Sequence, residues 1–401
     1  MYLVKLAFDN LRHNVKRTLA MIIIIAVATM AIILYQGYVE YSKEGMTLGF
    51  IQSTGDFQIA LTDYWNNNAS ETHIMNDEML KKILAKLKGD SRIDYYDCVY
   101  DFSGIVGNEN SSAIFWGKGF DRPEKQYSAK KGASVFGDDE NCVLLGEALA
   151  QKIGLKEFVE DEYVSLLTNS PESGMSLCSV KVNGFTNSGV LQNDSGLLIC
   201  SRKTVLDAME VENSATYIQV FLRERNSNKI KDELANYFSS ENIDAEIRTW
   251  KDLNPSFEQI NKLNEFQFYI ISVILCVLIF IALLQSVSTS LFERLGEFGT
   301  LEAIGLKKKK IIAMLLLEVF YLVICGLLLG LLLSLGVNTY VKIFDIKMVP
   351  PGYTEGYSLL FYFSTANIIK TCLFVTVCCF LSVTIPFVSV YKNSVNDLIH
   401  K

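Results

Sequence analysis

Four long apolar stretches constrain the fold of this 401-residue chain more than any other feature of its sequence. A bilayer core of roughly 30 Å needs about 20 apolar residues in a helix. Stretches of that length cover residues 18–37, 268–291, 311–337 and 371–391, and Glu318 is the one charged residue inside them. We therefore predict a membrane α-helical protein with four transmembrane helices. The first is expected to be an uncleaved anchor, because its small residues lie within the apolar run.

The charges are concentrated between the first and second apolar stretches. Residues 38–265 hold 36 of the 44 acidic and 23 of the 37 basic side chains, a net charge of −13. This acidity excludes nucleic acid as a partner. The segment 38–267 is therefore predicted to be a large aqueous domain between membrane spans.

The basic residues of the short segments predict the orientation in the cell membrane, because short loops rich in Lys and Arg stay in the cytoplasm. These residues are Lys5, Arg12, Lys16 and Arg17 before the first span, Arg294 and Lys307 to Lys310 between the second and third, and Lys392 and Lys401 after the fourth. Both termini and the loop 292–310 are thus expected to be cytoplasmic. The domain 38–267 and the loop 338–370 are expected to be periplasmic or extracellular.

The two ends of the chain complete this topology. Leu3, Ala7, Leu11 and Val15 recur every fourth residue, which predicts an amphipathic entry helix over residues 1–17 on the cytoplasmic side. A plain basic flank is the alternative. Residues 392–401 are expected to be a cytoplasmic tail.

The large domain is predicted to be an α+β domain of two lobes. Residues 55–62, 77–88 and 92–106 have the patterns of a strand, a helix and a strand, and residues 216–249 repeat this order. Residues 38–110 and 213–267 would form one lobe, with residues 111–212 as an inserted lobe. Cys98, Cys142, Cys178 and Cys200 lie in this domain, and either disulfides or free thiols remain open for them.

Motifs for catalysis, metal binding or phosphate binding do not occur in the sequence. The phosphate-binding loop, the zinc-protease and serine-hydrolase patterns, paired Cys-x-x-Cys and the calcium loop are missing, and the three His residues are scattered. We therefore predict no catalytic residues, no metal site and no cofactor bound by this chain.

The loop after the second span is the remaining candidate. Between Glu293 and Gly305 it has acidic residues early, a glycine at its end, and four lysines directly afterwards, which is typical of a short helix. An exposed Phe298 would make this helix a knob for a groove on a cytoplasmic partner. An ordinary polar connector is the alternative.

Several segments resemble one known family, the permease subunits of MacB/FtsX-like ABC transporters, which include the lipoprotein-releasing LolC and LolE proteins. They are the opening LVKLAFDNLRHNVKRTLA, the pair STGDFQI and VLLGEALAQKIGL in the large domain, TWKDLNPSF before the second span, and ERLGEFGTLEAIGLKKKKI after it. The resemblance implies a porter-like outer domain over residues 38–110 and 213–267. It also implies a dimer with a second permease copy or paralogue.

The resemblance further implies two ABC ATPase subunits as separate chains, which bind ATP and Mg. A coupling helix would dock on each of them, and its residues would be Glu293, Arg294, Glu297, Phe298, Gly299, Leu301, Ala303, Ile304 and Gly305. In this family, ATP-driven movement is passed to the outer domains by mechanotransmission. The chain itself would be a non-catalytic subunit.

The function implied is lipoprotein release, or export of an amphipathic or peptide substrate towards an extracytoplasmic acceptor. An FtsX-like regulatory transducer, or a permease for antimicrobial-peptide sensing or resistance, is the alternative. A receptor or adhesion protein without an ATPase is a third possibility, which the loop signature opposes.

Three features inside the spans bear on this mechanism. Glu318 must be paired, neutral or hydrated, so we expect either a tether to a basic group such as Arg17 or an extension to the membrane surface. Gly326 and Gly330 predict close helix packing. The second span lacks Pro and Gly, as expected of a stiff rod, whereas Pro386 predicts a kink in the fourth span.

Overall fold

The computed structural model divides the chain into two compact units. Unit 1 comprises Met1–Glu44, Gln259–Lys347 and Ser358–Lys401, and unit 2 comprises Gly45–Glu258 and Met348–Tyr357. The structure describes residues 15–62, 64–65, 74–133, 141–170, 174–189, 191–224, 227–303, 305–349 and 357–392. Most of the predicted entry helix 1–17 and of the tail 392–401 lies outside these ranges.

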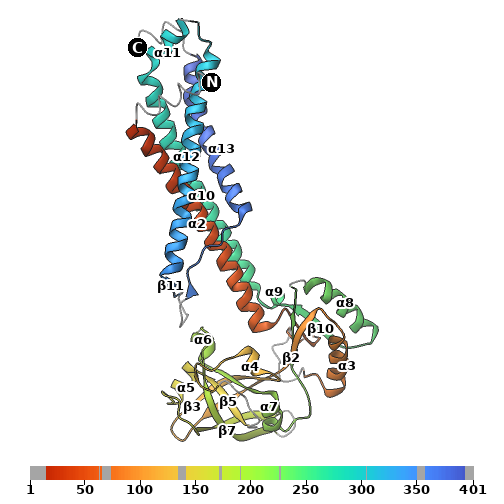
Figure 1. The fold of residues 1–401 in the computed structure, drawn as a ribbon. Helices are drawn as coiled ribbons and strands as arrows, with labels where there is room; N and C mark the ends of the chain where they lie inside the picture. Colours follow the sequence, from red (N-terminus) through yellow and green to blue (C-terminus); the bar gives the residue numbers. More distant parts are fainter. Residues whose placement is uncertain are drawn as a thin grey trace. The chain divides into compact units, whose positions relative to one another are not determined.

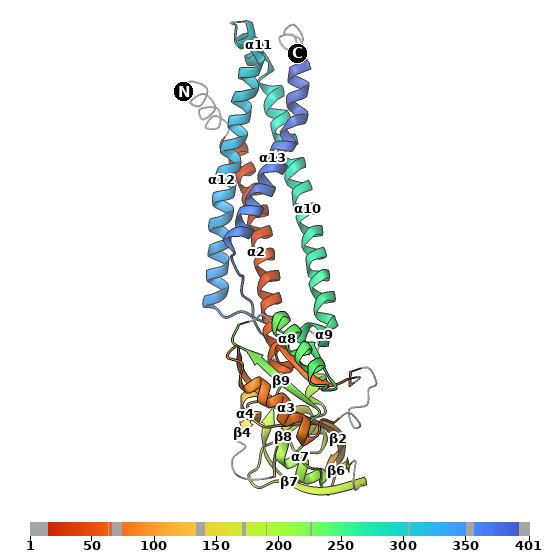
Figure 2. The ribbon, with the colours of Figure 1, turned by 90° about the vertical axis from the view of Figure 1, so that its right-hand side faces the viewer.

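Unit 1 is built from long helices (Figures 1 and 2). The helices are α2 (Val15–Thr54), α10 (Pro255–Glu293), α11 (Leu295–Ala303), α12 (Lys308–Ile343) and α13 (Thr365–Lys392). Four of them, α2, α10, α12 and α13, are long and apolar enough to cross a membrane. The prediction of four transmembrane helices is confirmed.

Two of these helices extend far beyond the predicted spans. α2 continues 17 residues past residue 37, and α10 begins at Pro255, 13 residues before residue 268. Proline suits the first turn of a helix, since the N–H that it lacks would have no partner there. The fall in hydropathy marks the end of the apolar surface and not the end of the helix. As a result, both helices belong partly to unit 1 and partly to unit 2.

Apolar side chains from all four long helices form the core of unit 1. Ile25, Ile279, Val323 and Val375, one from each helix, are at most 1% exposed. α12 meets α2 at its small residues: a Cβ added at Gly326 would lie 2.6 Å from Cγ2 of Ile25, and one at Gly330 would lie 2.7 Å from the carbonyl oxygen of Ala26. This is the close packing that the glycine spacing predicts.

α10 and α13 are also neighbours in unit 1. The Sγ atoms of Cys276 and Cys378 lie 3.1 Å apart. α13 continues past Pro386 to Lys392. The proline therefore does not end this helix.

Unit 2 contains a sheet with short helices. Its strands are β1 (Phe57–Leu61), β2 (Ile93–Gly107), β3 (Ser112–Phe120), β4 (Lys131–Gly132), β5 (Cys142–Gly146), β6 (Tyr163–Ser170), β7 (Gly174–Thr186), β8 (Leu197–Ser201), β9 (Tyr217–Leu222) and β10 (Ala245–Thr249). Its helices are α3 (Asp77–Lys88), α4 (Pro123–Gln126), α5 (Glu147–Lys152), α6 (Leu191–Asp194), α7 (Arg202–Met209), α8 (Ser227–Ser240) and α9 (Trp250–Leu253). A two-stranded pair, β11 (Lys347–Met348) and β12 (Tyr357–Ser358), lies in the loop between α12 and α13.

The first core of unit 2 lies between the antiparallel strands β10, β1, β9 and β2 and the helices α3 and α8 (Figure 1). α3 has the bounds that its apolar spacing predicts. Its first turn is capped by Asn76, whose side chain accepts a hydrogen bond from the backbone N–H of Met79. Leu80, Ile83 and Leu87 are buried on the side of α3 that faces this core.

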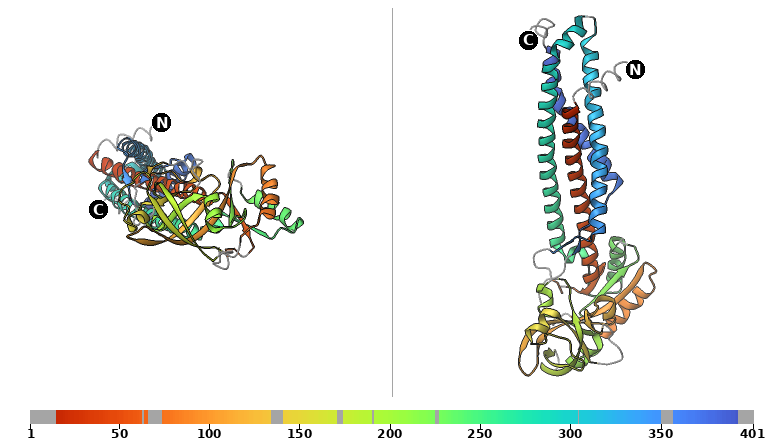
Figure 3. Two further views of the ribbon diagram at one scale, coloured as in Figure 1. Left: turned by 90° about the horizontal axis from the view of Figure 1, so that it is seen from below. Right: turned by 60° about the vertical axis from the view of Figure 1, so that its left-hand side comes forward.

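The second core lies inside a closed ring of six strands. Most of these strands are drawn in yellow to green in Figure 3. The ring runs β2, β3, β8, β5, β7 and β6, and β6 pairs with β2 to close it. Side chains such as Phe115 and Leu145 fill the ring together with Leu149 of α5 and Val205 of α7.

The α+β fold class agrees with the sequence analysis, but the sheet does not divide at residue 110. A third cluster of buried residues contains members from both predicted lobes, such as Ala60 and Leu144. β2 is 15 residues long, and it pairs with β9 in its first half and with β3 and β6 in its second half. One strand therefore contributes to both cores. Cys98, Cys142, Cys178 and Cys200 are free thiols.

Candidate functional site

The site predicted between the second and third spans consists of the end of α10, the helix α11 and the start of α12. α10 ends at Glu293, and Arg294 forms a turn before α11 starts at Leu295. Gly305 follows α11 with a φ of 101°, a left-handed conformation that favours glycine. The segment predicted as a single helix thus begins with a turn at Arg294, which we call the corner, and continues as the short helix α11.

Arg294 is the centre of this corner. Its Nη1 donates to Oε1 of Glu318 at 3.2 Å, and its Nε donates to Oε2 of Glu297 at 3.1 Å. The side chains of Arg294 and Glu318 are only 14% and 11% exposed. A charge buried in a helix bundle is costly unless it is paired. The ion pair therefore explains how the one charge inside a predicted span is accommodated.

The partner of Glu318 differs from the one that the sequence suggested. The carboxylate pairs with Arg294, and Arg17 pairs instead with Glu293 at 3.1 Å. This second pair is more exposed, with 23% of the Arg17 and 57% of the Glu293 side chain accessible. Sequence alone could not choose between the two arginines, because both lie near the same end of the predicted spans.

A cavity of about 290 Å³ lies beside the two ion pairs. Its lining includes Arg17, Arg294 and three carboxylates, as well as the hydroxyls of Ser286 and Ser290. The Ser286 hydroxyl is buried without a hydrogen-bond partner among the described residues. A polar cavity of this size can hold water, which would satisfy this hydroxyl. The serines belong to the site but were missed, since serine in a span gives no distinctive signal.

Phe298 corrects the sequence-based interpretation of the loop. Its side chain is 1% exposed and packs in the core of unit 1, with the Arg294 guanidinium 5.2 Å from the ring centre. The prediction that Phe298 is an exposed aromatic knob is therefore wrong. Periodicity placed Phe298 on one face of the helix, but it could not show that the bundle covers that face. Phe298 fixes α11 to the bundle.

The exposed side of α11 contains other predicted residues. Gly296 and Thr300 are exposed, and the side chain of Glu297 is 67% accessible. Gly299 is buried. Ile304 and the side chains of Leu301 and Ala303 lie outside the described part of the structure. Among the described side chains of α11, the accessible ones are therefore those around Gly296, Glu297 and Thr300.

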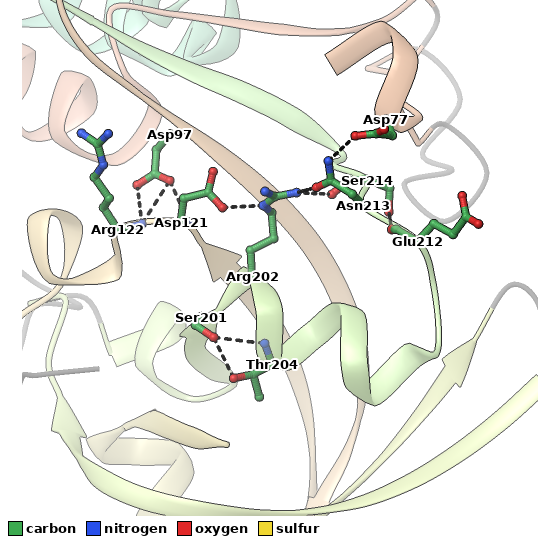
Figure 4. Close-up of polar contacts among 10 residues, drawn as sticks. All are labelled: Asp77, Asp97, Asp121, Arg122, Ser201, Arg202, Thr204, Glu212, Asn213 and Ser214. Carbon is green, nitrogen blue, oxygen red and sulfur yellow. Dashed lines mark hydrogen bonds and ion pairs between the residues drawn. The ribbon is translucent and has the colours of Figure 1, made fainter. Parts of the chain in front are cut away.

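Unit 2 has its own polar cluster, which is partly exposed and links α7 to the start of α3 (Figure 4). Nε of Arg202, on α7, donates to Asp121 at 2.6 Å, and its Nη1 donates to Oδ1 of Asn213 at 2.8 Å and to the carbonyl oxygen of Ser214 at 2.9 Å. Asn213 in turn donates to Asp77 at the start of α3. One arginine thus ties α7 to the segment that leads into β9.

Asp97 lies close to this cluster on β2. Its Oδ1 accepts a hydrogen bond from the backbone N–H of Asp121 at 2.8 Å, as Figure 4 shows. Burial, together with the nearby Asp121 carboxylate, raises the pKa of Asp97 to about 7. Within the described ranges, no three His, Cys, Asp or Glu side chains are grouped so as to hold a metal ion.

Comparisons with known proteins match parts of the chain. Residues 269–395 match the family model described as FtsX-like permease C-terminal. No curated protein matches the chain.

Two solved structures are similar to part of the chain. The periplasmic region of MacB from Actinobacillus actinomycetemcomitans is 17% identical, with a TM-score of 0.40, over 52% of this chain and 95% of that one. The extracellular domain of the noncanonic ABC-type transporter YknZ from Gram-positive bacteria is 11% identical, with a TM-score of 0.35, over 48% of this chain and 99% of that one.

Proposed function

We propose that this chain, whose residues 269–395 match the FtsX-like permease C-terminal family model, is a permease subunit of an ABC transporter and converts ATP hydrolysis by separate ATPase subunits into movement of its outer domain. In this proposal α11 and the corner at Arg294 receive the movement on the cytoplasmic side. Two ATPase subunits, which hold ATP and Mg, would bind a dimer of permeases. The sequence has no phosphate-binding loop of its own, which supports this division of work.

The observation that carries the proposal is the attachment of α11 to the bundle. Phe298 anchors the helix in the apolar core, and Arg294 links Glu297 on α11 to Glu318 on α12. A buried aromatic ring and a shielded ion pair resist displacement more than exposed contacts do. A partner that pushes on the exposed side of α11 would therefore move α10 and α12 with it.

The long helices support transmission over a distance. α10 has 39 residues, so it is about 58 Å long at roughly 1.5 Å per residue. The first residues of α10 and the last residues of α2 belong to unit 2. There the ring centres of Phe50 on α2 and Phe257 on α10 lie 6.0 Å apart, and those of Phe257 and Trp250 lie 4.7 Å apart. Gln219 of β9 donates to the carbonyl oxygen of Ser53 at 2.9 Å. Each helix is thus held by side chains in both units that it joins.

The basic short segments support placing both termini and α11 in the cytoplasm and unit 2 outside the membrane. For the transported material we propose a lipidated or amphipathic substrate of the outer leaflet, with lipoprotein release as the leading case. The size of unit 2, with several clusters of buried apolar residues, supports a substrate-handling role. A regulatory transducer is the alternative, and it would not release a lipoprotein.

One substitution tests the docking surface without disturbing the bundle. Gly296→Trp adds a large side chain on the exposed side of α11, where a Cβ meets no atom within 4 Å. Gly49→Trp is the matched control, since Gly49 is also an exposed helical glycine with open space around it. We expect Gly296→Trp to reduce binding of co-expressed ABC ATPase subunits by at least about tenfold. Equal ATPase recovery with both variants would contradict the assignment of α11.

Transport is tested separately in reconstituted vesicles. The full chain, its ATPase and a membrane-anchored lipoprotein are combined, and the lipoprotein in the soluble fraction is measured with and without ATP. We expect release that depends on ATP and that Gly296→Trp lowers. ATP hydrolysis without any release would favour the transducer.

A further inference from the structure

An exposed row of aliphatic side chains crosses four strands of the six-stranded ring in unit 2. Ile114 on β3 lies opposite Ile105 on β2, Ile105 lies opposite Leu167 on β6, and Leu167 lies opposite Leu177 on β7. Ile114 and Leu177 are 72% and 71% exposed, and Ile105 is 43% exposed. Side chains directly opposite on paired strands lie about 5 Å apart, so the row is continuous.

Trp116 and Met175 extend this row. Trp116 is 44% exposed and lies two residues along β3 from Ile114, and Met175 is 81% exposed and lies two residues along β7 from Leu177. We call the surface formed by these six side chains the outer apolar face. Its members are Ile105, Ile114, Trp116, Leu167, Met175 and Leu177.

The pairing register fixes these side chains on the outside of the ring. The alternate residues of the same strands, such as Phe115, Val106 and Leu166, are at most 1% exposed in the second core. A shift by one residue would exchange the buried and exposed sets. The side chains of the outer apolar face therefore point away from the second core and do not contribute to it.

The positions around the outer apolar face are small or neutral. On one side, Ser112 pairs with Gly107, Gly107 with Ser165, and Ser165 with Ser179. On the other side, Ser103 lies opposite Trp116, and Asn169 lies opposite Met175. Charge begins again two residues beyond Ser179, where Lys181 pairs with Asp161 at 2.7 Å. Depletion of charge around apolar side chains is typical of the centre of a protein interface.

The charge of the surrounding domain favours a second copy of the chain as the occupant of this face. Residues 38–265 carry a net charge of −13, so two copies repel each other over most of their surface. An uncharged face is where two such domains can meet without placing like charges together. Paired through a two-fold axis, the same face serves both copies.

The size of the face also favours a copy that is already held nearby. Four strands about 4.8 Å apart and two alternate positions about 6.8 Å apart give roughly 260 Å². A stable interface between free proteins buries about 800 Å² on each partner. A smaller contact suffices when the two domains are tethered, because tethering raises the effective concentration to about the millimolar range.

We infer that the outer apolar face is a contact between the outer units of two copies of this chain within one permease dimer. This inference rests on the proposed function, which supplies the dimer. The contact would be weak and separable, so that the outer units can part when the membrane helices move. It would add to the attachment of the two copies in the membrane and not replace it.

Site-specific photo-crosslinking in the full chain tests the contact. Two copies with different affinity tags are co-expressed and reconstituted with the ATPase, with and without ATP. Leu177 is replaced by benzoyl-phenylalanine in one copy. The control carries the same probe at Val159, which is 58% exposed and lies before β6, outside the face. We expect a crosslinked product with both tags from position 177, much more than from position 159.

A second variant separates the contact from the dimer itself. Ile114→Asp on both copies adds like charges to the face, and it should lower the crosslink at position 177 by about tenfold. Co-purification of the two tags should remain. Tags that co-purify without a crosslink at position 177 in either nucleotide state would overturn the inference and leave the proposed dimer intact. Crosslinks only to lipid or to another protein would also overturn it.

Loss of tag co-purification in the unmodified chain would contradict a dimer of two copies of this chain, and hence this inference, and it would leave a dimer with a paralogue as the form of the proposed function. That result differs from failure of the contact alone, because it needs no probe in unit 2.

Discussion

The two units each contain one largely buried arginine that holds a junction together, but the arginines are satisfied differently. Arg294 in unit 1 is 14% exposed and binds two carboxylates, and the more buried of these is Glu318. Arg202 in unit 2 is 15% exposed and binds one carboxylate, Asp121, which is 37% exposed, together with an amide oxygen and a backbone carbonyl.

The difference shows how the surroundings determine the value of an ion pair. Arg294 and Glu318 lie between the apolar core of the helix bundle and the polar cavity. The other charged groups that line this cavity are two more carboxylates and Arg17, which is already paired with Glu293. The environment of Arg202 borders water and offers neutral acceptors. The junction in unit 1 should thus fail as a whole when one charge is removed, whereas the junction in unit 2 should loosen locally.

The largest effect is expected when Arg294 is removed alone. Arg294→Met leaves the buried Glu318 without its arginine, and we expect a loss of about 3–5 kcal/mol in the free energy of unfolding. The measurement is reversible denaturant unfolding of the full chain in detergent micelles. The double variant Arg294→Met with Glu318→Leu should recover most of this loss. If the single and double variants were equally unstable, the unpaired charge of Glu318 would not be the cause of the loss in stability.

A smaller effect is expected from the corresponding change in unit 2. Arg202→Met removes three hydrogen bonds but leaves acceptors that water can reach, so we expect a loss of about 1–3 kcal/mol. Hydrogen exchange should show the loss in α7 and at the start of β9, with little change in α10. Asp207→Asn, at an exposed position of the same helix, is the control. Uniform loss of protection across both units would show that the two junctions do not differ as argued.

The stability of unit 2 should depend on pH because of Asp97, which lies beside the Arg202 cluster. The native pKa of Asp97 is about 7, above the value of about 3.9 in an unfolded chain. The native state holds a proton that the unfolded state has lost, so this stabilisation is full below pH 4 and disappears by about pH 7. Its slope is at most about 1.4 kcal/mol per pH unit.

Asp97→Asn tests this term, because the amide has no charge to gain. The free energy of unfolding of the variant should increase relative to that of the unmodified chain as the pH rises from about 4 to 7. Above pH 7 the difference between the two should be constant. Local hydrogen exchange in β2 at several pH values gives the measurement. A difference that does not change with pH would mean that Asp97 is ionised throughout.

The parts of this molecule that depend on neighbouring residues could be predicted from its sequence. The apolar length of the four spans and the spacing of α3 set those elements, because helix formation and membrane insertion depend on a continuous segment. The pairing of Glu318 was one of two expected outcomes, since a lone charge in a span requires stabilisation.

The parts that depend on distant residues could not be predicted. The burial of Phe298 depends on which surface α11 rests against. The choice of Arg294 over Arg17 depends on the corner after α10, and closure of the ring depends on pairing between β2 and β6, which are far apart in the chain. A periodic pattern defines the faces of an element, but not what covers each face.

The smallest effect is expected at the second ion pair of unit 1, and it sharpens the comparison within one unit. Glu293 lies one residue before Arg294, yet 57% of its side chain is exposed to solvent, and its partner Arg17 is 23% exposed. Solvent screens such a pair, so Glu293→Gln should change the free energy of unfolding by less than about 1 kcal/mol. The same denaturant titration that is used for Arg294→Met measures it. An effect as large as that of Arg294→Met would mean that burial is not what separates the two pairs, and that the whole polar cavity acts as one network.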